Sequence, residues 1–167
     1  MSAVALRAPE AGDFEPMKAV VSACDATWRD WTPADWEPPA PESERWVSQL
    51  GAPDRWTRVA VEPDGRLVGL ISWSAARSGP EWRTVPGVAH LAALFVHPDR
   101  WRRGVASQLL AAAIDAMRAQ GYARARLHTP EGAPAERFYA AHGWMRGNES
   151  RWHEVVRLQS VEYTIEL

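Results

Sequence analysis

Cysteine is nearly absent from the sequence, with Cys24 the only one among 167 residues. A single cysteine cannot form an internal disulfide, as is usual for proteins of reducing compartments. Residues 1–16 also lack the basic and then apolar layout of a secretory signal. Together these two absences predict a cytoplasmic protein.

Long apolar runs and an excess of positive charge are missing as well. No stretch approaches the roughly 18 consecutive apolar residues of a membrane-spanning helix, so we expect no association with a membrane. The 19 basic and 21 acidic side chains give a net charge of −2, which supplies no general attraction for the phosphate backbone of a nucleic acid. A nucleic-acid partner is therefore not expected, and any local cluster of arginines needs a local explanation.

Apolar and aromatic side chains are abundant by contrast. Hydrophobic residues make up 46% of the chain, enough for the core of one domain, and no repeat or linker divides residues 1–167. Ten tryptophans are present, four of them between residues 28 and 46 among four prolines. Rigid aromatic surface on irregular backbone serves either as ordinary packing or as the wall of a pocket. For the second use, the candidate substrate contacts are Trp28, Trp31, Trp36 and Trp73.

The spacing of apolar and turn residues predicts strands and helices along the whole chain. Asp13 can cap the first helix, and the turn residues PDG at 63–65 fit a β-hairpin. The run at 88–96 is apolar nearly throughout, which predicts a strand buried on both faces. The expected elements, in chain order, are a strand at 4–6, helices from 13 and at 42–50, strands at 57–62 and 67–75, a loop at 78–87, a strand at 88–96, a helix from 104 to 121, a strand at 123–129, a helix at 133–143, and strands from 144 and at 158–167.

The segment HPDRWRRGVASQLL, residues 97–110, joins an apolar strand to the helix that follows it. Strand, helix and next strand form a βαβ unit, whose two strands should be parallel neighbours. The first N–H groups of a helix have no intrahelical partner, and the helix dipole makes that end partly positive, so the junction can bind an anion. Gly104 and Ala106 leave room for it, and Arg102 and Arg103 add positive charge. The junction suits a phosphate or pyrophosphate; the alternative is a solvated turn whose arginines only aid solubility.

At this junction the chain resembles the GCN5-related N-acetyltransferase (GNAT) family. The acetyl-coenzyme A motif of the family is Gln/Arg-x-x-Gly-x-Gly/Ala, and residues 101–106 read WRRGVA, with Trp101 where Gln or Arg is usual. A second family motif, Asn-x-x-Ala-x-x-Phe-Tyr-x-x-x-Gly-Phe, is matched by residues 132–144, GAPAERFYAAHGW. Gly132 replaces the Asn of this motif, and Trp144 replaces its last Phe. The order of elements also matches, so the resemblance covers essentially the whole chain.

The resemblance implies one α/β (α+β) domain over residues 1–167. Its central twisted sheet would be mixed and mostly antiparallel, with a splayed parallel strand pair and helices on both faces. The expected parts are the first strand and acceptor-side helices at 1–56, the central strands at 57–97, the acetyl-coenzyme A motif at 98–130, and the C-terminal helix and strands at 131–167.

The activity that the resemblance implies is transfer of an acetyl group from acetyl-coenzyme A to a primary amine, by direct attack in a ternary complex. A small-molecule amine is the expected acceptor; the alternatives are a protein N-terminus or lysine, or a module that binds acyl-coenzyme A without catalysis. The resemblance also allows a homodimer, and it implies no metal. The family residues carried over as cofactor contacts are Leu94, Phe95, Val96, Arg102, Arg103, Gly104, Val105, Ala106, Ser107, Gly132, Ala135 and Phe138.

Three residues are candidates for the proton transfers of this reaction. Tyr139 matches the family's general acid, a phenol that can protonate the leaving sulfur; its alternative role is packing between helix and sheet. His90 stands where relatives acting on arylalkylamines have the first of two histidines, but the second position here is Ala92. It is either a base or water relay, or an ordinary strand histidine. Glu131 is the second candidate base.

In the family the first two helices and the last hairpin form the acceptor site, and in this chain the segment of the first helices is rich in tryptophan. Four carboxylates accompany the tryptophans: Asp25, Asp30, Asp35 and Glu37. Aromatic rings beside carboxylates suit a cationic amine through cation–π and ionic contacts. The alternative is that these carboxylates face water, as charges on short helices commonly do.

Overall fold

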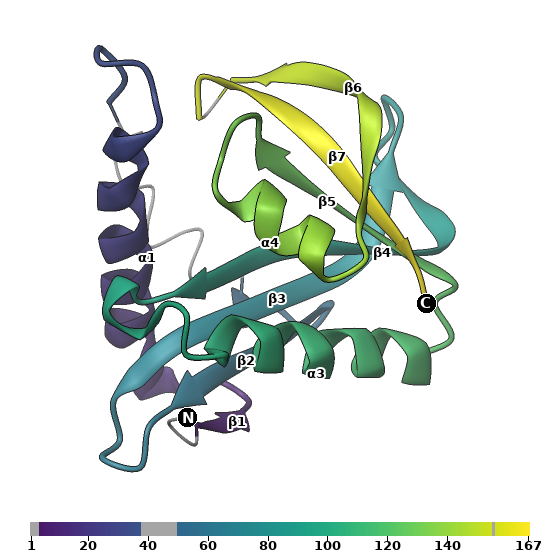
Figure 1. The fold of residues 1–167 in the computed structure, drawn as a ribbon. Coiled ribbons are helices and arrows are strands. Elements are labelled where there is room, and N and C mark those ends of the chain that lie inside the picture. The colour runs from purple at the N-terminus through teal and green to yellow at the C-terminus, as the bar shows by residue number, and fades with distance from the viewer. Residues whose placement is uncertain (1–3, 38–49, 155) are drawn as a thin grey trace.

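The computed structural model describes residues 4–37, 50–154 and 156–167, which form one seven-stranded sheet with helices on both faces (Figure 1). The strands lie in the order β1-β2-β3-β4-β5-β7-β6. All neighbours pair antiparallel except β4 and β5, which are parallel. The predicted mixed, mostly antiparallel sheet is therefore confirmed. The strands are β1 Ala5–Arg7, β2 Arg55–Val61, β3 Leu67–Ser78, β4 Arg83–Val96, β5 Arg124–Pro130, β6 Met145–His153 and β7 Leu158–Glu166.

The helices cover the two faces of the sheet separately. Side chains of adjacent strand residues point to opposite faces, and in β3 Leu70 packs in one cluster with Met17 of α1, while Ile71 packs in another with Leu109 of α3. Tyr139 of α4 belongs to the same cluster as α3. The helices of the described ranges are α1 Phe14–Ala26, α3 Val105–Ala119 and α4 Ala135–Ala141, with short 3-10 helices at Ala11–Asp13, Thr27–Asp30 and Pro98–Arg100.

The first helix starts where the sequence predicts, with Asp13 at its N-cap position, but the Asp13 side chain forms no capping hydrogen bond to α1. The Asp13 carboxylate accepts hydrogen bonds from the Arg7 guanidinium and from the backbone N–H of Glu10, and so closes the 3-10 turn that precedes α1. This ion pair holds the pKa of Asp13 below its usual value. Of the helix predicted at 42–50, residues 42–49 lie outside the described residues.

The strand β4 differs from its prediction in length and in burial. Arg77 pairs with Thr84, so the strands take up most of the expected loop at 78–87. Ala89 and Leu91 are buried, whereas His90 between them is only half-buried, so the strand is not buried on both faces. An apolar run alone does not reveal whether a strand continues on each side of it. Along the last part of β4 the pairing with β3 continues to Val96, whereas the pairing with β5 ends at His90.

Two irregularities of β4 open the sheet near its centre. Ser72 and Trp73 of β3 pair with Ala93 and Leu91, which leaves Ala92 as an extra residue, a β-bulge. On the other side, β4 pairs with β5 only from Val88 to His90, although both strands continue beyond this point. The parallel pair therefore splays, as the resemblance implies.

Candidate functional site

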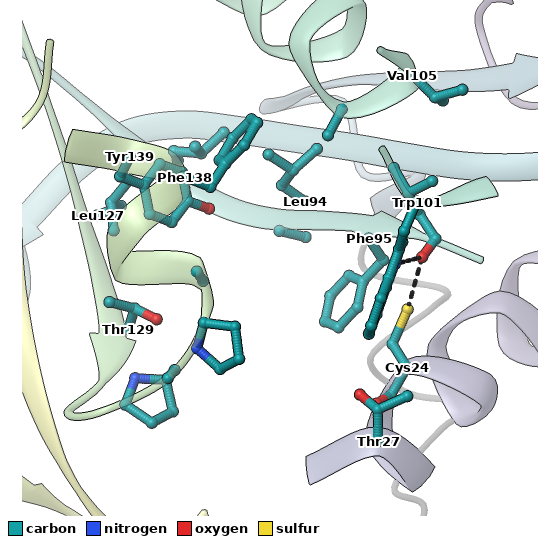
Figure 2. Close-up of a pocket in the computed structure, with 18 of the residues that line it drawn as sticks. Cys24, Thr27, Leu94, Phe95, Trp101, Val105, Leu127, Thr129, Phe138 and Tyr139 are labelled. Carbon is teal, nitrogen blue, oxygen red and sulfur yellow. Dashed lines mark hydrogen bonds between the residues drawn. The ribbon is translucent and has the colours of Figure 1, made fainter. Parts of the chain in front are cut away.

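A cavity of about 590 Å³ lies where β4 and β5 separate (Figure 2). Its lining comes from both strands, the start of α3, the α4 region, and the end of α1 with the 3-10 helix after it. Figure 2 shows Tyr139 and Thr129 on one side of the opening and Trp101 and Thr27 on the other, with Leu94 between them. The volume falls within the ordinary range of small-molecule pockets.

One end of the cavity is the turn that leads into α3. Gly104 has a φ of +81°, in the left-handed region that favours glycine, and Arg102 has a φ of +61°. A Cβ atom on Gly104 would meet only the side chain of Gln108, at 4.0 Å, so conformation rather than space calls for the glycine. Since α3 begins at Val105, its first N–H groups have no partner within the helix and are available to an anion.

Most of the predicted cofactor residues line this cavity. Arg103 and Gly132 do not: neither side chain nor backbone of these two residues belongs to its lining. The predicted residues that the structure does bring to the cavity are Leu94, Phe95, Val96, Arg102, Gly104, Val105, Ala106, Ser107, Ala135 and Phe138.

Trp101, which stands where the family motif has Gln or Arg, forms part of the cavity wall. The indole N–H donates to the carbonyl oxygen of Val96 at 2.7 Å, and the Cys24 thiol donates to the same oxygen at 3.1 Å. Burial raises the pKa of the Cys24 thiol to about 12, so the sulfur keeps its hydrogen. The two donors connect α1, the end of β4 and the α3 turn through one carbonyl group.

Tyr139 lies on the opposite wall, in the second turn of α4. It is 8% exposed, and its ring lies against those of Phe138, Trp144 and Tyr163. Figure 2 shows its hydroxyl turned towards the cavity. Burial raises the pKa of Tyr139 well above its ordinary value, because the phenolate would be poorly solvated, and the phenol is therefore protonated at neutral pH.

His90 does not reach the cavity, but a second histidine beside it does. His128 lines the cavity from β5, and the centres of the two imidazole rings are 5.8 Å apart. Burial is the main cause that lowers the pKa of each to about 4, and nearby arginines, Arg126 and Arg151 among them, lower both further. Both rings are therefore neutral at pH 7. The sequence predicts β4 and β5 as parallel neighbours, and each strand carries a histidine. This combination could have identified His128 as a neighbour of His90.

Glu131 does not line the cavity. Its carboxylate forms an ion pair with Arg146, whose guanidinium also contacts Glu136 at 3.4 Å, and the Glu131 side chain is 45% exposed. Because the Glu131 carboxylate is paired with the Arg146 guanidinium outside the cavity lining, the structure does not favour Glu131 as the base.

The four candidate tryptophans divide into two kinds. Trp28 and Trp31 line the cavity, with their ring centres 5.3 Å apart. Trp36 stacks on Trp28 outside the lining, and its indole donates to the carbonyl oxygen of Val156 at 2.8 Å. Trp73 is 2% exposed in the core, and the structure does not bring it to the cavity. A buried large aromatic in a central strand is packing, and sequence alone does not separate this use from a pocket wall.

The carboxylates predicted beside the tryptophans do not lie in this cavity, although Asp35 and Glu37 line a smaller pocket together with Trp36. No aspartate or glutamate of the described ranges lines the cavity, and Asp25, Asp30, Asp35 and Glu37 all lie outside it. Besides His128, Cys24 and Tyr139, the titratable side chains in the lining are those of Arg100 and Arg102, and Arg100 is bound to Glu62 by two hydrogen bonds. Lining residues that the sequence analysis did not name include Thr27, Thr129, Pro130 and Pro134.

In the described part of the chain, no three histidine, cysteine, aspartate or glutamate side chains gather as a metal site requires. None of its helices has the length and apolar content needed to cross a membrane.

Comparison with known proteins identifies relatives of this architecture. The Acetyltransferase (GNAT) family matches residues 21–144. No curated protein matches the sequence.

Solved structures match over nearly the full length. A GCN5-related N-acetyltransferase from Kribbella flavida is 20% identical with a TM-score of 0.70, and the match covers 99% of this chain and 98% of that one. The PaiA N-acetyltransferase from Thermoplasma acidophilum, solved in complex with coenzyme A, is 16% identical with a TM-score of 0.69 and 99% coverage of both chains. The ribosomal-protein-S18-alanine N-acetyltransferase from Escherichia coli is 16% identical with a TM-score of 0.70, and the match covers 98% of this chain and 94% of that one.

Proposed function

The chain belongs to the acetyltransferase (GNAT) family, and from this premise we propose that it transfers the acetyl group of acetyl-coenzyme A to a primary amine of a small molecule. The family assignment makes it an acyl-coenzyme A-dependent N-acyltransferase with acetyl-coenzyme A as co-substrate. In the proposed reaction the amine attacks the thioester directly, while both substrates are bound.

The observation that carries the proposal is the position of the cavity. It lies in the splay between β4 and β5, with an anion-binding helix start at one end and a protonated phenol on one wall. Acetyl transfer needs these parts: a site for the cofactor phosphates, a channel for its arm, and a proton for the departing thiolate. A cavity of about 590 Å³ also suits a small acceptor better than a folded protein surface.

The cofactor would be held mainly by backbone groups. The pyrophosphate would accept hydrogen bonds from the N–H groups at 102–107, with the charge of Arg102 nearby. The unpaired end of β4, from Leu94 to Val96, would offer main-chain groups to the pantetheine arm and to the thioester carbonyl. Gly132, which replaces the family's Asn, has no side chain to contribute and does not line the cavity. Acetyl-coenzyme A supplies the activated acyl group when it is bound.

His128 and His90 would take the proton that the amine loses. His128 lines the cavity, and His90 lies behind it at 5.8 Å between ring centres, so His90 would act through His128 or a water molecule. Both imidazoles are neutral above a pH of about 4 and can accept a proton. Glu162 Oε2 lies 3.5 Å from Nε2 of His128 and would stabilise the imidazolium that forms.

Replacing His128 by glutamine should therefore produce a pH-dependent loss of activity. We expect kcat/KM to fall by roughly 10²-fold near pH 6.5, where most of an aliphatic amine is protonated, with the deficit shrinking as the pH approaches the pKa of the amine. His90→Gln should follow the same pH trend with a smaller loss. The measurement is a pH profile of kcat/KM for the parent and both variants; equal losses at every pH would show that the two rings only position the substrate.

Trp101→Ala should weaken coenzyme A binding by less than about tenfold. The indole is part of the cavity wall, whereas the proposed phosphate contacts are backbone N–H groups of the turn. Trp101→Phe is the matched control, since it keeps an aromatic ring of smaller area and removes the hydrogen bond to Val96. Titration calorimetry with coenzyme A measures both. If the alanine variant lost affinity as severely as a charged substitution at Gly104, the side chain at position 101 would hold the cofactor directly.

The proposed function is tested by incubating the protein with acetyl-coenzyme A and a panel of amines while free thiol is followed. The panel should contain aromatic, aliphatic and amino-acid amines, together with a peptide that has an N-terminal alanine. Release of thiol with a small amine supports the proposal, and release with the peptide alone would replace the small-molecule acceptor by a protein one. Coenzyme A binding with no release for any acceptor would favour a non-catalytic binding module.

A further inference from the structure

A side-chain hydrogen bond that the proposed chemistry does not use joins the start of α3 to the end of α4. The Ser107 hydroxyl lies 2.9 Å from Nε2 of His142, and Nδ1 of the same ring lies 2.7 Å from the carbonyl oxygen of Phe138. The imidazole also lies against the Phe138 ring, with 4.2 Å between the ring centres. His142 is thus held at both nitrogens and on one face.

The chemistry of the atoms fixes the direction of each hydrogen bond. A carbonyl oxygen can only accept, so Nδ1 of His142 carries the hydrogen that is donated to Phe138. In a neutral imidazole the other nitrogen is then an acceptor, and the Ser107 hydroxyl donates to it. The hydroxyl hydrogen of Ser107 is therefore directed at α4.

The two residues link the anion-binding turn to the helix that carries the phenol. Ser107 is the third residue of α3 and lines the cavity at that turn. His142 follows the last residue of α4, and its backbone N–H bonds to the carbonyl oxygen of Tyr139. Among the described residues, Ser107 to His142 is the one side-chain hydrogen bond between the two helices.

The position of α4 depends on such contacts, because a helix of seven residues is not stable alone in water. On the sheet side, Glu136 accepts hydrogen bonds from Tyr163 and from the N–H of Gly132, each at 2.7 Å. On the α3 side, the bond from Ser107 to His142 is the corresponding polar contact. The placement of Tyr139 therefore depends on both.

We propose that His142 is a positioning residue that, through Ser107, couples occupancy of the cofactor turn to the position of Tyr139. This coupling rests on the proposed function, since it takes the turn as the pyrophosphate site. An anion bound at the turn orders the first residues of α3, the Ser107 hydroxyl then holds His142 in a fixed place, and His142 holds the end of α4. Coupling of this kind is reciprocal, so an ordered α4 also favours the bound cofactor.

Hydrogen exchange can test the coupling without knowledge of the acceptor. The probe is 3′-phosphoadenosine 5′-diphosphate, which carries a pyrophosphate but lacks the pantetheine arm that would reach Tyr139. In the parent protein the probe should slow amide exchange at the start of α3 and also at 135–141. Because Ser107 and α4 line the same cavity, variants of Ser107 and His142 are needed to distinguish protection that passes through the protein from direct contact of the fragment with α4.

Two variants remove the hydrogen bond, one by changing its donor and one by changing its acceptor. If one of them fails to fold, the other still tests the coupling. Ser107→Ala and His142→Phe should both keep the probe's protection of α3 and lose its protection of 135–141. Arg137→Ala, an exposed position on the same helix, is the matched control and should keep both. With a confirmed acceptor, each variant should also lower kcat roughly tenfold with little change in the KM for acetyl-coenzyme A, and the double variant should lose no more than either one.

The possible failures are distinguishable. No protection of α3 in the parent would overturn the pyrophosphate site and the coupling with it. Protection of α3 alone in the parent, or unchanged protection of α4 in both variants, would overturn only the coupling. A higher Kd for the probe in Ser107→Ala alone, with α4 still protected, would make Ser107 a phosphate ligand and leave His142 a packing residue.

Discussion

Gly104→Asp should weaken coenzyme A binding by roughly 100- to 1,000-fold while the protein stays folded. The substitution brings a negative charge to the site proposed for the pyrophosphate, and two unit charges about 4 Å apart interact by about 4 kcal/mol at an effective dielectric constant near 20. A side chain at this position is also strained, because Gly104 has a φ of +81°. Titration calorimetry with coenzyme A, on protein with unchanged circular dichroism, measures the loss.

Two matched variants separate charge from strain. Gly104→Asn has nearly the same shape without the charge, and Asn tolerates the left-handed region, so most of the affinity should remain. Gly121→Asp places the same residue at a φ of +82° just past the other end of α3, where an added Cβ would meet nothing within 4 Å, and should leave coenzyme A affinity unchanged. Unchanged affinity in folded Gly104→Asp would place the cofactor phosphates elsewhere.

The fold could be predicted from the sequence because the strongest local patterns in the sequence all indicate the same arrangement. The apolar strand, the glycine turn and the amphipathic helix from Gly104 predicted a parallel pair, and β4 and β5 are that pair. The bulge at Ala92 had no comparable signal. It depends on the pairing of β3 with β4 rather than on any property of alanine, so only the assembled sheet reveals it.

The candidate site was only partly predictable from the sequence, because whether a residue lines a cavity depends on the residues that lie beside it in space. Residues at the α3 turn could be identified, since the backbone conformation required there calls for glycine. Trp28 and Trp73 have the same chemistry, yet one lines the cavity and the other is buried in the core. His128 was missed because its role depends on the strand beside it and not on a motif of its own.

Tyr139→Phe should slow the chemical step by about 10²-fold while fold and cofactor binding are kept. The ring can still pack against Trp144 and Tyr163, and no hydrogen bond joins the hydroxyl to another described residue, so none would be lost. What is lost is the proton offered to the leaving sulfur. Because a simple thiol has a pKa of about 8.5, thiolate is a tolerable leaving group, and the loss should lie near the lower end of the roughly 10²- to 10⁴-fold range for general-acid catalysis.

The pH dependence of this loss distinguishes an acid from a packing residue. Burial raises the pKa of Tyr139, so the parent phenol stays protonated from pH 6 to 9 and the deficit of Tyr139→Phe should be constant across that window, unlike the deficit expected for His128→Gln. Tyr122→Phe removes the hydroxyl of a partly buried tyrosine that lies edge-on to Trp73 outside the cavity, and this variant should transfer at the parent rate. Single-turnover acetyl transfer is the decisive measurement, because slow product release would hide a slower chemical step. If Tyr139→Phe transferred acetyl as fast as the parent, the tyrosine would be a packing residue and the sulfur would take its proton from water or another side chain.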